Sequence, residues 1–143
     1  MSRISVIIPT LEEEADLARL LACLDPAREE VIVVDGRSRD GTCDVARSRA
    51  GVTLLETRPP RSRQLNAAAA RASGDVLLFL HADAIPPRDW REAILRALAD
   101  ERVVGGAFDL AIDAHGTAPR LVAGGARLRR RVSRSPYGDQ GRV

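Results

Sequence analysis

Two carboxylates stand at the ends of two apolar runs of this sequence, and their positions predict shared chemistry. The run Val31–Val34 ends at Asp35, and the run Val76–Leu80 leads through two further residues to Asp83. Continuous apolar runs are typical of parallel strands that are buried on both faces of a sheet. In open α/β sheets, ligands bind beyond the carboxyl ends of the strands. Two carboxylates at that edge can hold a nucleotide and a metal ion, which predicts an enzyme that handles a nucleotide-activated substrate.

Around these carboxylates, β-rich runs alternate with segments whose apolar residues have helical spacing. The runs predict strands over residues 4–8, 31–35, 52–56, 75–81 and 103–112. The other segments predict helices over residues 11–24, 40–49 (with Asp40 as N-cap), 64–72, 88–99 and 118–132. Repeated alternation favours an α/β fold, with a mostly parallel sheet that helices flank through right-handed crossovers. Residues 1–143 are expected to form one domain.

The composition excludes some kinds of chemistry. All 22 basic residues are arginine, so Schiff-base chemistry and a phosphate-binding lysine are both excluded. The arginines are interspersed with acids and aromatic residues make up only 3%, which argues against nucleic-acid binding. The two cysteines, Cys23 and Cys43, lack metal-ligand spacing and are expected to be reduced and structural.

The sequence also bears on location and assembly. It has no signal-peptide pattern and no apolar stretch of the roughly 20 residues that cross a bilayer, so a cytoplasmic protein is expected. The basic segment Arg127–Arg134 could contact an anionic membrane at its inner face, although a solvated helix face is the simpler interpretation. An uncovered apolar strand edge would favour a homodimer.

The motifs around the two carboxylates resemble those of family 2 glycosyltransferases of the GT-A (Rossmann-like) fold. They are Ile7-Ile8-Pro9-Thr10, Glu12-Glu13, Val33-Val34-Asp35-Gly36 with Ser38, Asp40-Gly41-Thr42 and His81-Ala82-Asp83. Three others are similar to a bacterial subgroup often labelled arsenosugar-biosynthesis glycosyltransferases: Arg63-Gln64-Leu65-Asn66-Ala67, Gly105-Gly106-Ala107-Phe108 and Tyr137-Gly138-Asp139-Gln140-Gly141. The resemblance covers essentially the whole chain. It implies sugar transfer from a nucleotide-diphosphate sugar, with a UDP-sugar favoured, to an acceptor that the sequence does not identify.

The resemblance assigns roles to both carboxylates. It implies that Asp35 hydrogen-bonds the nucleobase, since a carboxylate can accept from the imide N–H of uracil. The alternative is a turn cap, but Ser38 and Asp40 are better placed for capping. It implies that Asp83 ligates Mn²⁺ or Mg²⁺, which would bridge the diphosphate. The alternative there is an acid that merely ends a strand. His81 replaces the family's first acid, and either a ribose or metal-shell contact or simple packing would suit it.

The remaining expected contacts follow from the same motifs. Arg63 could reach the diphosphate or the base, with Arg58 and Arg61 as alternatives. Glu13 could contact the nucleoside or only favour a helix start. The full set expected to bind the nucleotide sugar is Pro9, Thr10, Glu13, Asp35, Ser38, Arg63, Asn66, His81, Ala82 and Asp83.

No residue is predicted to be the catalytic base. In the family, the base comes from a later acidic segment, and this sequence ends at Val143 before any such segment. The C-terminal part of the fold is therefore expected to be incomplete, and a non-catalytic nucleotide-binding module is the alternative to an active transferase. A nucleotidyltransferase would carry a Gly-rich basic loop where this sequence has Leu11-Glu12-Glu13-Glu14, which argues against that class.

Overall fold

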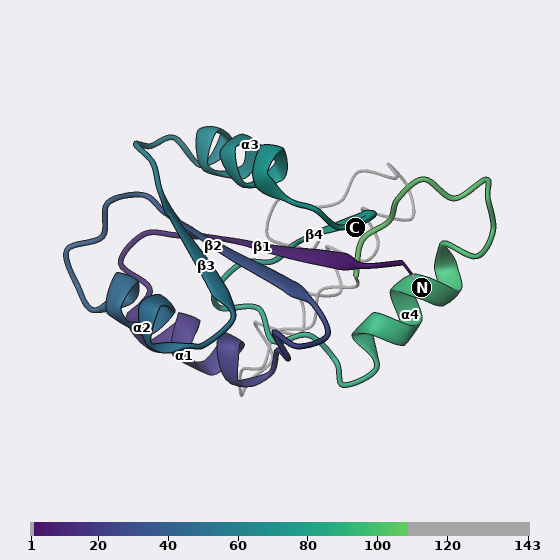
Figure 1. The fold of residues 1–143 in the computed structure, drawn as a ribbon, viewed down its shortest axis with the longest axis horizontal. Helices are drawn as coiled ribbons and strands as arrows, with labels where there is room; N and C mark the ends of the chain where they lie inside the picture. The colour runs from purple at the N-terminus through teal and green to yellow at the C-terminus, as the bar shows by residue number, and fades with distance from the viewer. Residues whose placement is uncertain (1, 109–143) are drawn as a thin grey trace, which may run out of the picture.

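The structure is a computed structural model of the chain, and it describes residues 2–108. In these residues, strands and helices alternate along the chain (Figure 1). The strands are β1 (Ile4–Thr10), β2 (Glu30–Asp35), β3 (Val52–Glu56) and β4 (Val76–Phe79). The helices are α1 (Glu14–Ala22), α2 (Thr42–Ser48), α3 (Arg61–Arg71) and α4 (Trp90–Ala97). The predicted α/β alternation is confirmed over this part of the chain.

The strands form one parallel sheet in the order β3-β2-β1-β4. β1 lies between its partners, with Thr10 opposite Asp35 of β2 and Ile7 opposite Phe79 of β4. The chain first adds strands on one side of β1 and then crosses to the other side for β4. This reversal creates a topological switch point between β1 and β4, and α/β sheets bind ligands at such points, beyond the carboxyl ends of the strands.

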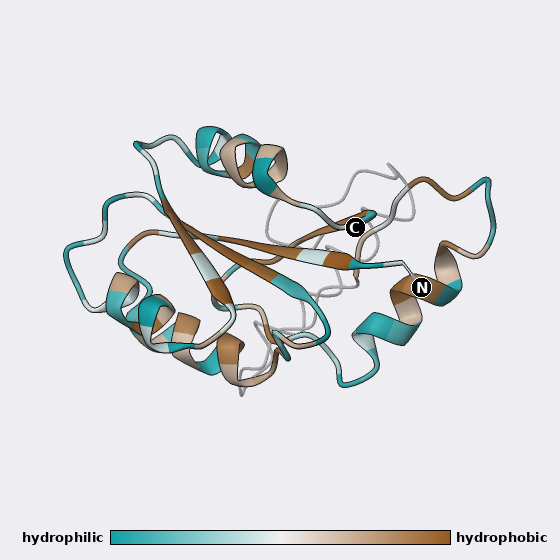
Figure 2. Cartoon of the chain, in the orientation of Figure 1, coloured by the Kyte–Doolittle hydropathy of each residue, from teal (hydrophilic) through white to brown (hydrophobic). Residues whose placement is uncertain are grey.

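Each face of the sheet has its own apolar cluster, because successive side chains of a strand point to opposite faces. On one face, alternate residues of β1 and β2 pack with Leu20 of α1 and Trp90 of α4. On the other face, Ile7 and Ile32 pack with Ala68 of α3. Figure 1 shows α1 and α2 on one side of the sheet and α3 on the other, and Figure 2 shows the strands as predominantly apolar. The carboxyl ends of β1 and β2 are therefore held by packing on both faces.

Some element ends differ from the sequence prediction because they depend on contacts between distant segments. α3 begins at Arg61, so Arg63 lies in its first turn rather than in the predicted loop. β4 ends at Phe79, and the following residues turn, with the Ala84 N–H donating to the His81 carbonyl at 3.1 Å. The N-cap of α2 is Gly41 rather than Asp40. The Asp40 side chain still accepts from Thr42 N–H at 3.0 Å in the first turn of α2, and it also accepts from Glu14 N–H of α1 at 3.3 Å.

The predicted fifth strand over residues 103–112 is wrong in its described part. Residues 103–106 have no strand structure, and Ala107 makes only an isolated bridge. Gly105 and Gly106 lack side chains that could pack on a sheet, which weakens a strand at this position. Residues 109–112, the predicted helix 118–132 and the motif at residues 137–141 lie outside the described residues. Within residues 2–108, no helix is long and apolar enough to cross a membrane.

Glu30 links β1, β2 and the segment before β4 at the end of the sheet opposite the switch point. Its carboxylate accepts hydrogen bonds from Ser5 Oγ, from Ser73 N–H at 2.8 Å and from Ser73 Oγ at 2.9 Å. The Ser5 hydroxyl oxygen accepts in turn from Gly74 N–H at 2.9 Å. Burial alone would raise the pKa of Glu30, but these hydrogen bonds outweigh it and hold the pKa below the ordinary value of 4.5.

The depressed pKa of Glu30 predicts a loss of stability in acid. A carboxyl whose pKa is lower in the folded state stabilises the fold above its unfolded-state pKa, and this contribution is lost as the pH falls through the folded-state pKa. We expect the free energy of unfolding to fall between about pH 5 and pH 3, and to fall less in Glu30→Gln. Urea unfolding across this range tests the prediction, with Glu92→Gln, at an exposed carboxylate, as the control. An equal fall in the wild type and Glu30→Gln would contradict it.

Candidate functional site

The segments that follow β1 and β4 bring charged side chains together at the switch point. Glu13 follows β1, His81 and Asp83 follow β4, and the first turn of α3 contributes Arg61. Arg61 Nη1 lies 3.0 Å from His81 Nδ1 and 3.3 Å from His81 Nε2. Because a guanidinium can only donate, the imidazole accepts through an unprotonated nitrogen. Arg61, an alternative to Arg63 in the sequence analysis, is therefore the arginine that joins this cluster.

The half-buried carboxylate of Glu13 responds to the whole cluster. Burial raises the pKa of Glu13 most, and the charge of Asp83 raises it further. The pKa is lowered by a hydrogen bond from Leu11 N–H at 3.3 Å and by the charges of Arg61 and His81. The result is a pKa above the ordinary value of 4.5. Since the carboxylates of Glu13 and Asp83 repel each other, a cation bound near them would favour both charged forms.

The Asp83 side chain is exposed after the end of β4, where a cation from solvent can reach it. Within residues 2–108, no group of three or more His, Cys, Asp and Glu side chains is arranged to hold a metal ion. Mg²⁺ is commonly bound through one or two carboxylates, with phosphates of the substrate and water supplying the other ligands. The residues present therefore fit an ion that binds together with a diphosphate, and do not form a metal site by themselves.

Asp35 lies at the end of β2 and is fully buried, with 0% exposure. Its Oδ1 accepts from Thr10 Oγ1 at 3.1 Å and from Ser38 Oγ at 2.5 Å, while its Oδ2 accepts from Ser38 N–H at 2.7 Å. Burial, together with the neighbouring Asp35 carboxylate, raises the pKa of the Cys43 thiol to about 11. The predicted residues Thr10, Asp35 and Ser38 thus form one hydrogen-bonded unit, which fixes the loop after β2.

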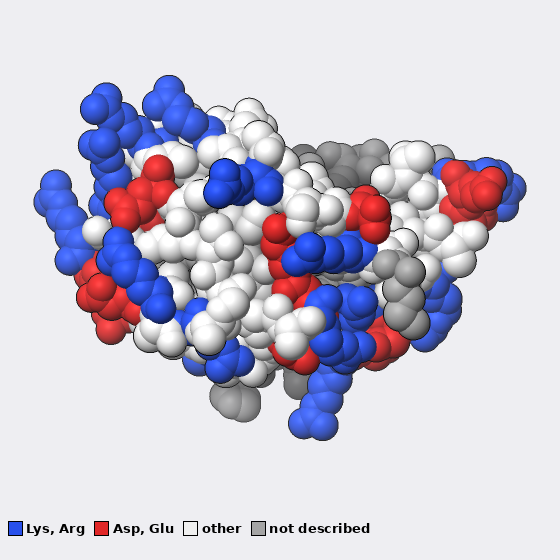
Figure 3. All heavy atoms as spheres, viewed as in Figure 1, with Lys and Arg blue, Asp and Glu red and all other residues white. Residues whose placement is uncertain are grey.

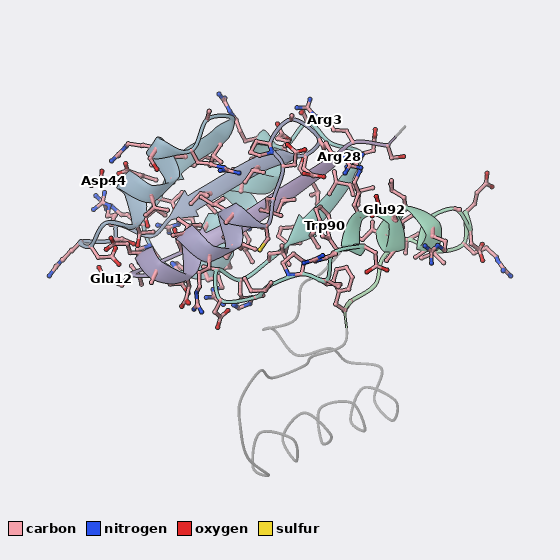
Figure 4. The ribbon with its side chains drawn as sticks, turned by 90° about the horizontal axis from the view of Figure 1, so that it is seen from below. Arg3, Glu12, Arg28, Asp44, Trp90 and Glu92 are labelled. Atoms are coloured by element: carbon pink, nitrogen blue, oxygen red, sulfur yellow. The ribbon has the colours of Figure 1, made fainter. Side chains whose placement is uncertain are left out.

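The loops after β1 and β2 are also joined through backbone groups. Glu12 N–H donates to Ser38 Oγ at 2.8 Å, and Arg39 N–H donates to Glu12 Oε1 at 2.7 Å. Glu12 and Arg37 have φ values of 57° and 74°, in the left-handed region that favours glycine. Such strain persists only where the surrounding structure imposes it, and it is concentrated at functional sites. Figure 4 shows Glu12 at the end of the molecule remote from Trp90 and α4.

Replacement of the strained Arg37 by glycine should stabilise the protein. The left-handed conformation costs a non-glycine residue about 1–2 kcal/mol, whereas the greater flexibility of unfolded glycine costs about 0.5–1 kcal/mol. We expect Arg37→Gly to increase the free energy of unfolding by about 0.5–1 kcal/mol. Arg39→Gly, at a neighbour without positive φ, is the matched control and should not stabilise. Urea unfolding measures both, and a lower stability of Arg37→Gly would contradict the prediction.

Gln64, which the sequence analysis did not select, closes the site beneath these loops. It is 5% exposed in α3, and its Nε2 donates to the Thr10 carbonyl at 2.9 Å and to the Val34 carbonyl at 2.8 Å. The side chain therefore joins the carboxyl ends of β1 and β2. Its spacing of four residues from the buried Ala68 places it on the inner face of the helix, and this spacing is the signal that could have identified it.

The other predicted residues divide into buried and exposed groups. Pro9 and Ala82 are buried, whereas Arg63 and Asn66 are exposed on α3. Figure 3 shows arginines gathered at the end of the molecule where α3 begins and where the loop after β2 lies. The exposed arginines of these segments are Arg37, Arg39, Arg58, Arg61 and Arg63. A surface of this charge attracts anionic ligands to the site.

The fold and the site together define a GT-A-like α/β domain with a charged cluster at its switch point. The sequence model described as Glycosyl transferase family 2 matches residues 5–137. The chain therefore belongs to glycosyltransferase family 2, as its motifs predicted.

Curated relatives support the same family. The chain is 30% identical over 128 residues to the glycosyltransferase AglE of Haloferax volcanii, covering 80% of this chain and 42% of the relative. It is 34% identical over 118 residues to the succinoglycan biosynthesis protein ExoA of Rhizobium meliloti, covering 80% of this chain and 28% of the relative. The chain thus spans less than half the length of these two relatives.

Solved structures support the fold. The mannosyltransferase PcManGT from Pyrobaculum calidifontis, in complex with GDP-Man and Mn²⁺, superposes with a TM-score of 0.75 at 27% identity, covering 99% of this chain and 44% of that chain. Glucosyl-3-phosphoglycerate synthase from Mycobacterium tuberculosis, in complex with Mn²⁺ and UDP among its ligands, has a TM-score of 0.72 at 22% identity, covering 99% of this chain and 56% of that chain. The second likeness is one of fold alone.

Proposed function

We propose that this family 2 glycosyltransferase transfers a sugar from a nucleotide-diphosphate sugar, with a UDP-sugar as the favoured donor, in a metal-assisted reaction. The observation that carries the proposal is the convergence of Glu13, Arg61, His81 and Asp83 at the switch point of the sheet. The structure of PcManGT with GDP-Man and Mn²⁺ supports a donor and a metal ion of this kind.

Each residue then has a role in holding the donor. Asp83 would hold Mn²⁺ or Mg²⁺ together with the diphosphate, and the ion would neutralise the charge that develops on the leaving diphosphate. Arg61 and Arg63 would donate to phosphate oxygens, since a guanidinium forms a planar fork of donors. His81 orients Arg61 through their hydrogen bond, and Glu13 would lie beside the nucleoside.

The loops after β1 and β2 would form the base and ribose side of the donor site. The unit of Thr10, Asp35 and Ser38 fixes their shape, and the buried Pro9 and Ala82 contribute backbone. Asn66 lies one turn after Arg63 on α3 and would extend the polar surface around the donor.

We propose that transfer proceeds with inversion, which needs a carboxylate that takes the proton of the acceptor. The acids late in the sequence are Asp109, Asp113 and Asp139. None of them matches the motif of the family's catalytic base, and all three lie outside the described residues. Membership of the arsenosugar-biosynthesis subgroup, a cytoplasmic location and homodimerisation belong to this proposal as predictions from the sequence, with contact at the inner face of the membrane as the alternative to a solvated helix face.

A thermal-shift panel of UDP, GDP, CDP and ATP, each with Mn²⁺ and with EDTA, tests donor binding. We expect UDP with Mn²⁺ to raise Tm and EDTA to reduce the rise. No shift with any nucleotide, in a protein that melts cooperatively, would contradict the proposal. Release of UDP from UDP-sugars tests turnover, and binding without any release or transfer would favour the non-catalytic module.

A further inference from the structure

The strand β3 lies at one edge of the sheet. Its neighbour is β2, and within residues 2–108 no strand pairs with its other side. An edge strand presents a row of backbone N–H and C=O groups to which another chain can pair, and natural proteins commonly protect such edges with lysine, proline or inward-pointing charges. The sequence of β3, Val-Thr-Leu-Leu-Glu, has no lysine or proline, and its one acid is the last residue. The outer side of β3 is therefore a surface for strand pairing.

The backbone of β3 determines which groups face this outer side. The N–H and C=O groups of successive residues point to opposite sides of a strand. Thr57 N–H, directly after the strand, donates to the Asp35 carbonyl of β2 at 2.9 Å, so every second residue before it also faces β2. The residues whose backbone groups point outward are Val52, Leu54 and Glu56. Val52 N–H agrees with this direction, because it donates to the Arg49 carbonyl at 3.2 Å and not to β2.

The side chains of β3 leave apolar area at the edge on both faces of the sheet. Leu54 packs on the cluster beneath α1 and Leu55 on the cluster beneath α3, yet both leucines are only partly buried. α3 packs mainly on β1 and β2, and Thr53, on the same face as Leu55, is exposed. A further strand beside β3 would remove this apolar area from water.

The outward groups of β3 complement those of a second copy. If two β3 strands run antiparallel around a two-fold axis at Leu54, the two Leu54 residues exchange both of their backbone hydrogen bonds. Glu56 N–H of each copy then donates to the Val52 carbonyl of the other. The outward N–H that this pairing does not use is that of Val52, which already donates to Arg49. The same strand serves both copies, as an isologous interface requires.

The charges of the strand suit this register. Glu56 lies opposite Val52 of the other copy, and the two Glu56 residues are separated along the strands by the distance from residue 52 to residue 56, about 13 Å. Like charges therefore do not lie opposite each other, which would destabilise a pair of strands.

We propose that β3 is a dimer interface, at which the strand pairs antiparallel with β3 of a second copy to form one continuous sheet. On one face the two Leu54 side chains meet, and on the other face Leu55 of each copy contacts Thr53 of its partner. The switch point lies between β1 and β4, on the far side of β2, so both donor sites stay accessible. The inference names the surface of the homodimer that the sequence predicts, and it does not depend on the proposed donor site.

Two measurements on the intact wild type test the interface. Sedimentation over a concentration series measures assembly, and amide hydrogen exchange by NMR locates it. We expect a monomer–dimer equilibrium in which Leu54 and Glu56 N–H exchange about tenfold more slowly well above the Kd than in the dilute monomer. Thr53 and Leu55 N–H are the internal control and should change less, because they face β2 in both states.

Three results of these measurements would overturn the inference. A monomer throughout the series would show that the copies do not pair. A dimer with unchanged exchange at Leu54 and Glu56 would place the interface elsewhere. A monomer in which both amides exchange slowly would mean that residues 109–143 cover the edge.

A proline at the edge tests the hydrogen bonds. Glu56→Pro removes an outward N–H without touching the ladder to β2, and edge strands tolerate proline at such positions. Glu56→Ala is the matched control, since it removes the same carboxylate and its ion pair with Arg47 but keeps the N–H. We expect Glu56→Pro to raise the dimer Kd about tenfold, because each dimer loses two hydrogen bonds, and Glu56→Ala to raise it less than about threefold. Equal effects of the two substitutions would overturn the inference.

Cysteine cross-linking tests the register. Leu54→Cys and Leu55→Cys are each made in a Cys23→Ser chain, because Cys23 is exposed. Around an axis at Leu54, the Cα atoms of the two residues 54 are about 5.5 Å apart, which a disulfide can bridge. The two residues 55 are diagonal neighbours at about 7–8 Å, beyond that range. We expect oxidation to link the copies of Leu54→Cys alone, and any other result would overturn the pairing at Leu54.

Discussion

Asp83→Ala should remove the Mn²⁺-dependent part of the rise in Tm that a nucleotide diphosphate produces, while the Tm of the free protein stays unchanged. The free protein is unaffected because the Asp83 side chain is exposed and lies beyond the last residue of β4. A ligand at 100 times its Kd contributes about 2.7 kcal/mol of stability, which in a domain of this size is a shift on the order of 10 °C. Sugar transfer should be lost with the same substitution.

The control for this experiment is an acid that is also exposed but belongs to α2 rather than to the segments around the switch point. Asp44 on α2 is 86% exposed and pairs with Arg47, so Asp44→Ala should retain the Mn²⁺-dependent shift. EDTA with the wild type should reproduce the behaviour of Asp83→Ala. A shift of Asp83→Ala that still depends on Mn²⁺ would show that the ion is held elsewhere, and would remove Asp83 from the metal site.

The strands were predictable because their signal is local. A strand that is buried on both faces requires an unbroken apolar run, as β1 shows with every residue buried. The edge strand β3 is partly exposed, and it too occupies the residues, Val52–Glu56, that its sequence predicted. The location of the site at the carboxyl end of the sheet followed from the same reasoning, since parallel strands place Asp35 and the segment before Asp83 at one end. The fifth strand shows the limit, because an apolar stretch that contains Gly105-Gly106 forms a strand only where a neighbour pairs with it.

The polar contacts of the site were not predictable, because they join residues distant in the sequence. Gln64 donates to carbonyls that precede it by 54 and 30 residues, and its letter alone describes only a good helix former. The partners of Asp35 include Thr10, 25 residues earlier, so its full engagement could not be inferred from its place at a strand end. The start of α3 at Arg61 was also not predictable, because Arg61 contacts His81, which lies 20 residues later in the sequence.

The second large effect is expected at the ion pair between α4 and the segment before β2. Arg91 Nη1 lies 3.4 Å from Glu29 Oε1, and the two side chains are only 13% and 4% exposed. Removal of one partner of a buried pair leaves an uncompensated charge, which costs about 3–5 kcal/mol. We expect Arg91→Met to lower the free energy of unfolding by about 3 kcal/mol, a large share of the roughly 5–15 kcal/mol of a typical domain.

The neighbouring residue provides the matched control. Glu92 pairs with Arg28 at 3.6 Å, but both side chains are more than half exposed. An exposed pair contributes about 0–1 kcal/mol, so Glu92→Gln should change stability little. Arg91→Met combined with Glu29→Gln should regain part of the loss, because the buried charge is then absent. Urea unfolding of the wild type, Arg91→Met, Glu29→Gln and the double variant measures the coupling, and additive effects of the two substitutions would contradict a direct interaction.

Arg91→Met should lower stability without changing nucleotide binding, whereas Asp83→Ala should abolish metal-linked nucleotide binding without changing stability. This contrast distinguishes residues that stabilise the fold from residues that bind the donor. Arg91 anchors α4 beside the cluster around Trp90, and within residues 2–108 its hydrogen bonds and ion pair go to Arg28 and Glu29 rather than to the switch point. The folded fraction of Arg91→Met should therefore bind UDP and Mn²⁺ with the wild-type Kd. Asp83→Ala should melt like the wild type and fail to bind the metal-linked nucleotide. Loss of nucleotide affinity in folded Arg91→Met would mean that the turn carrying Asp83 depends on α4 for its position, and that α4 is part of the donor site.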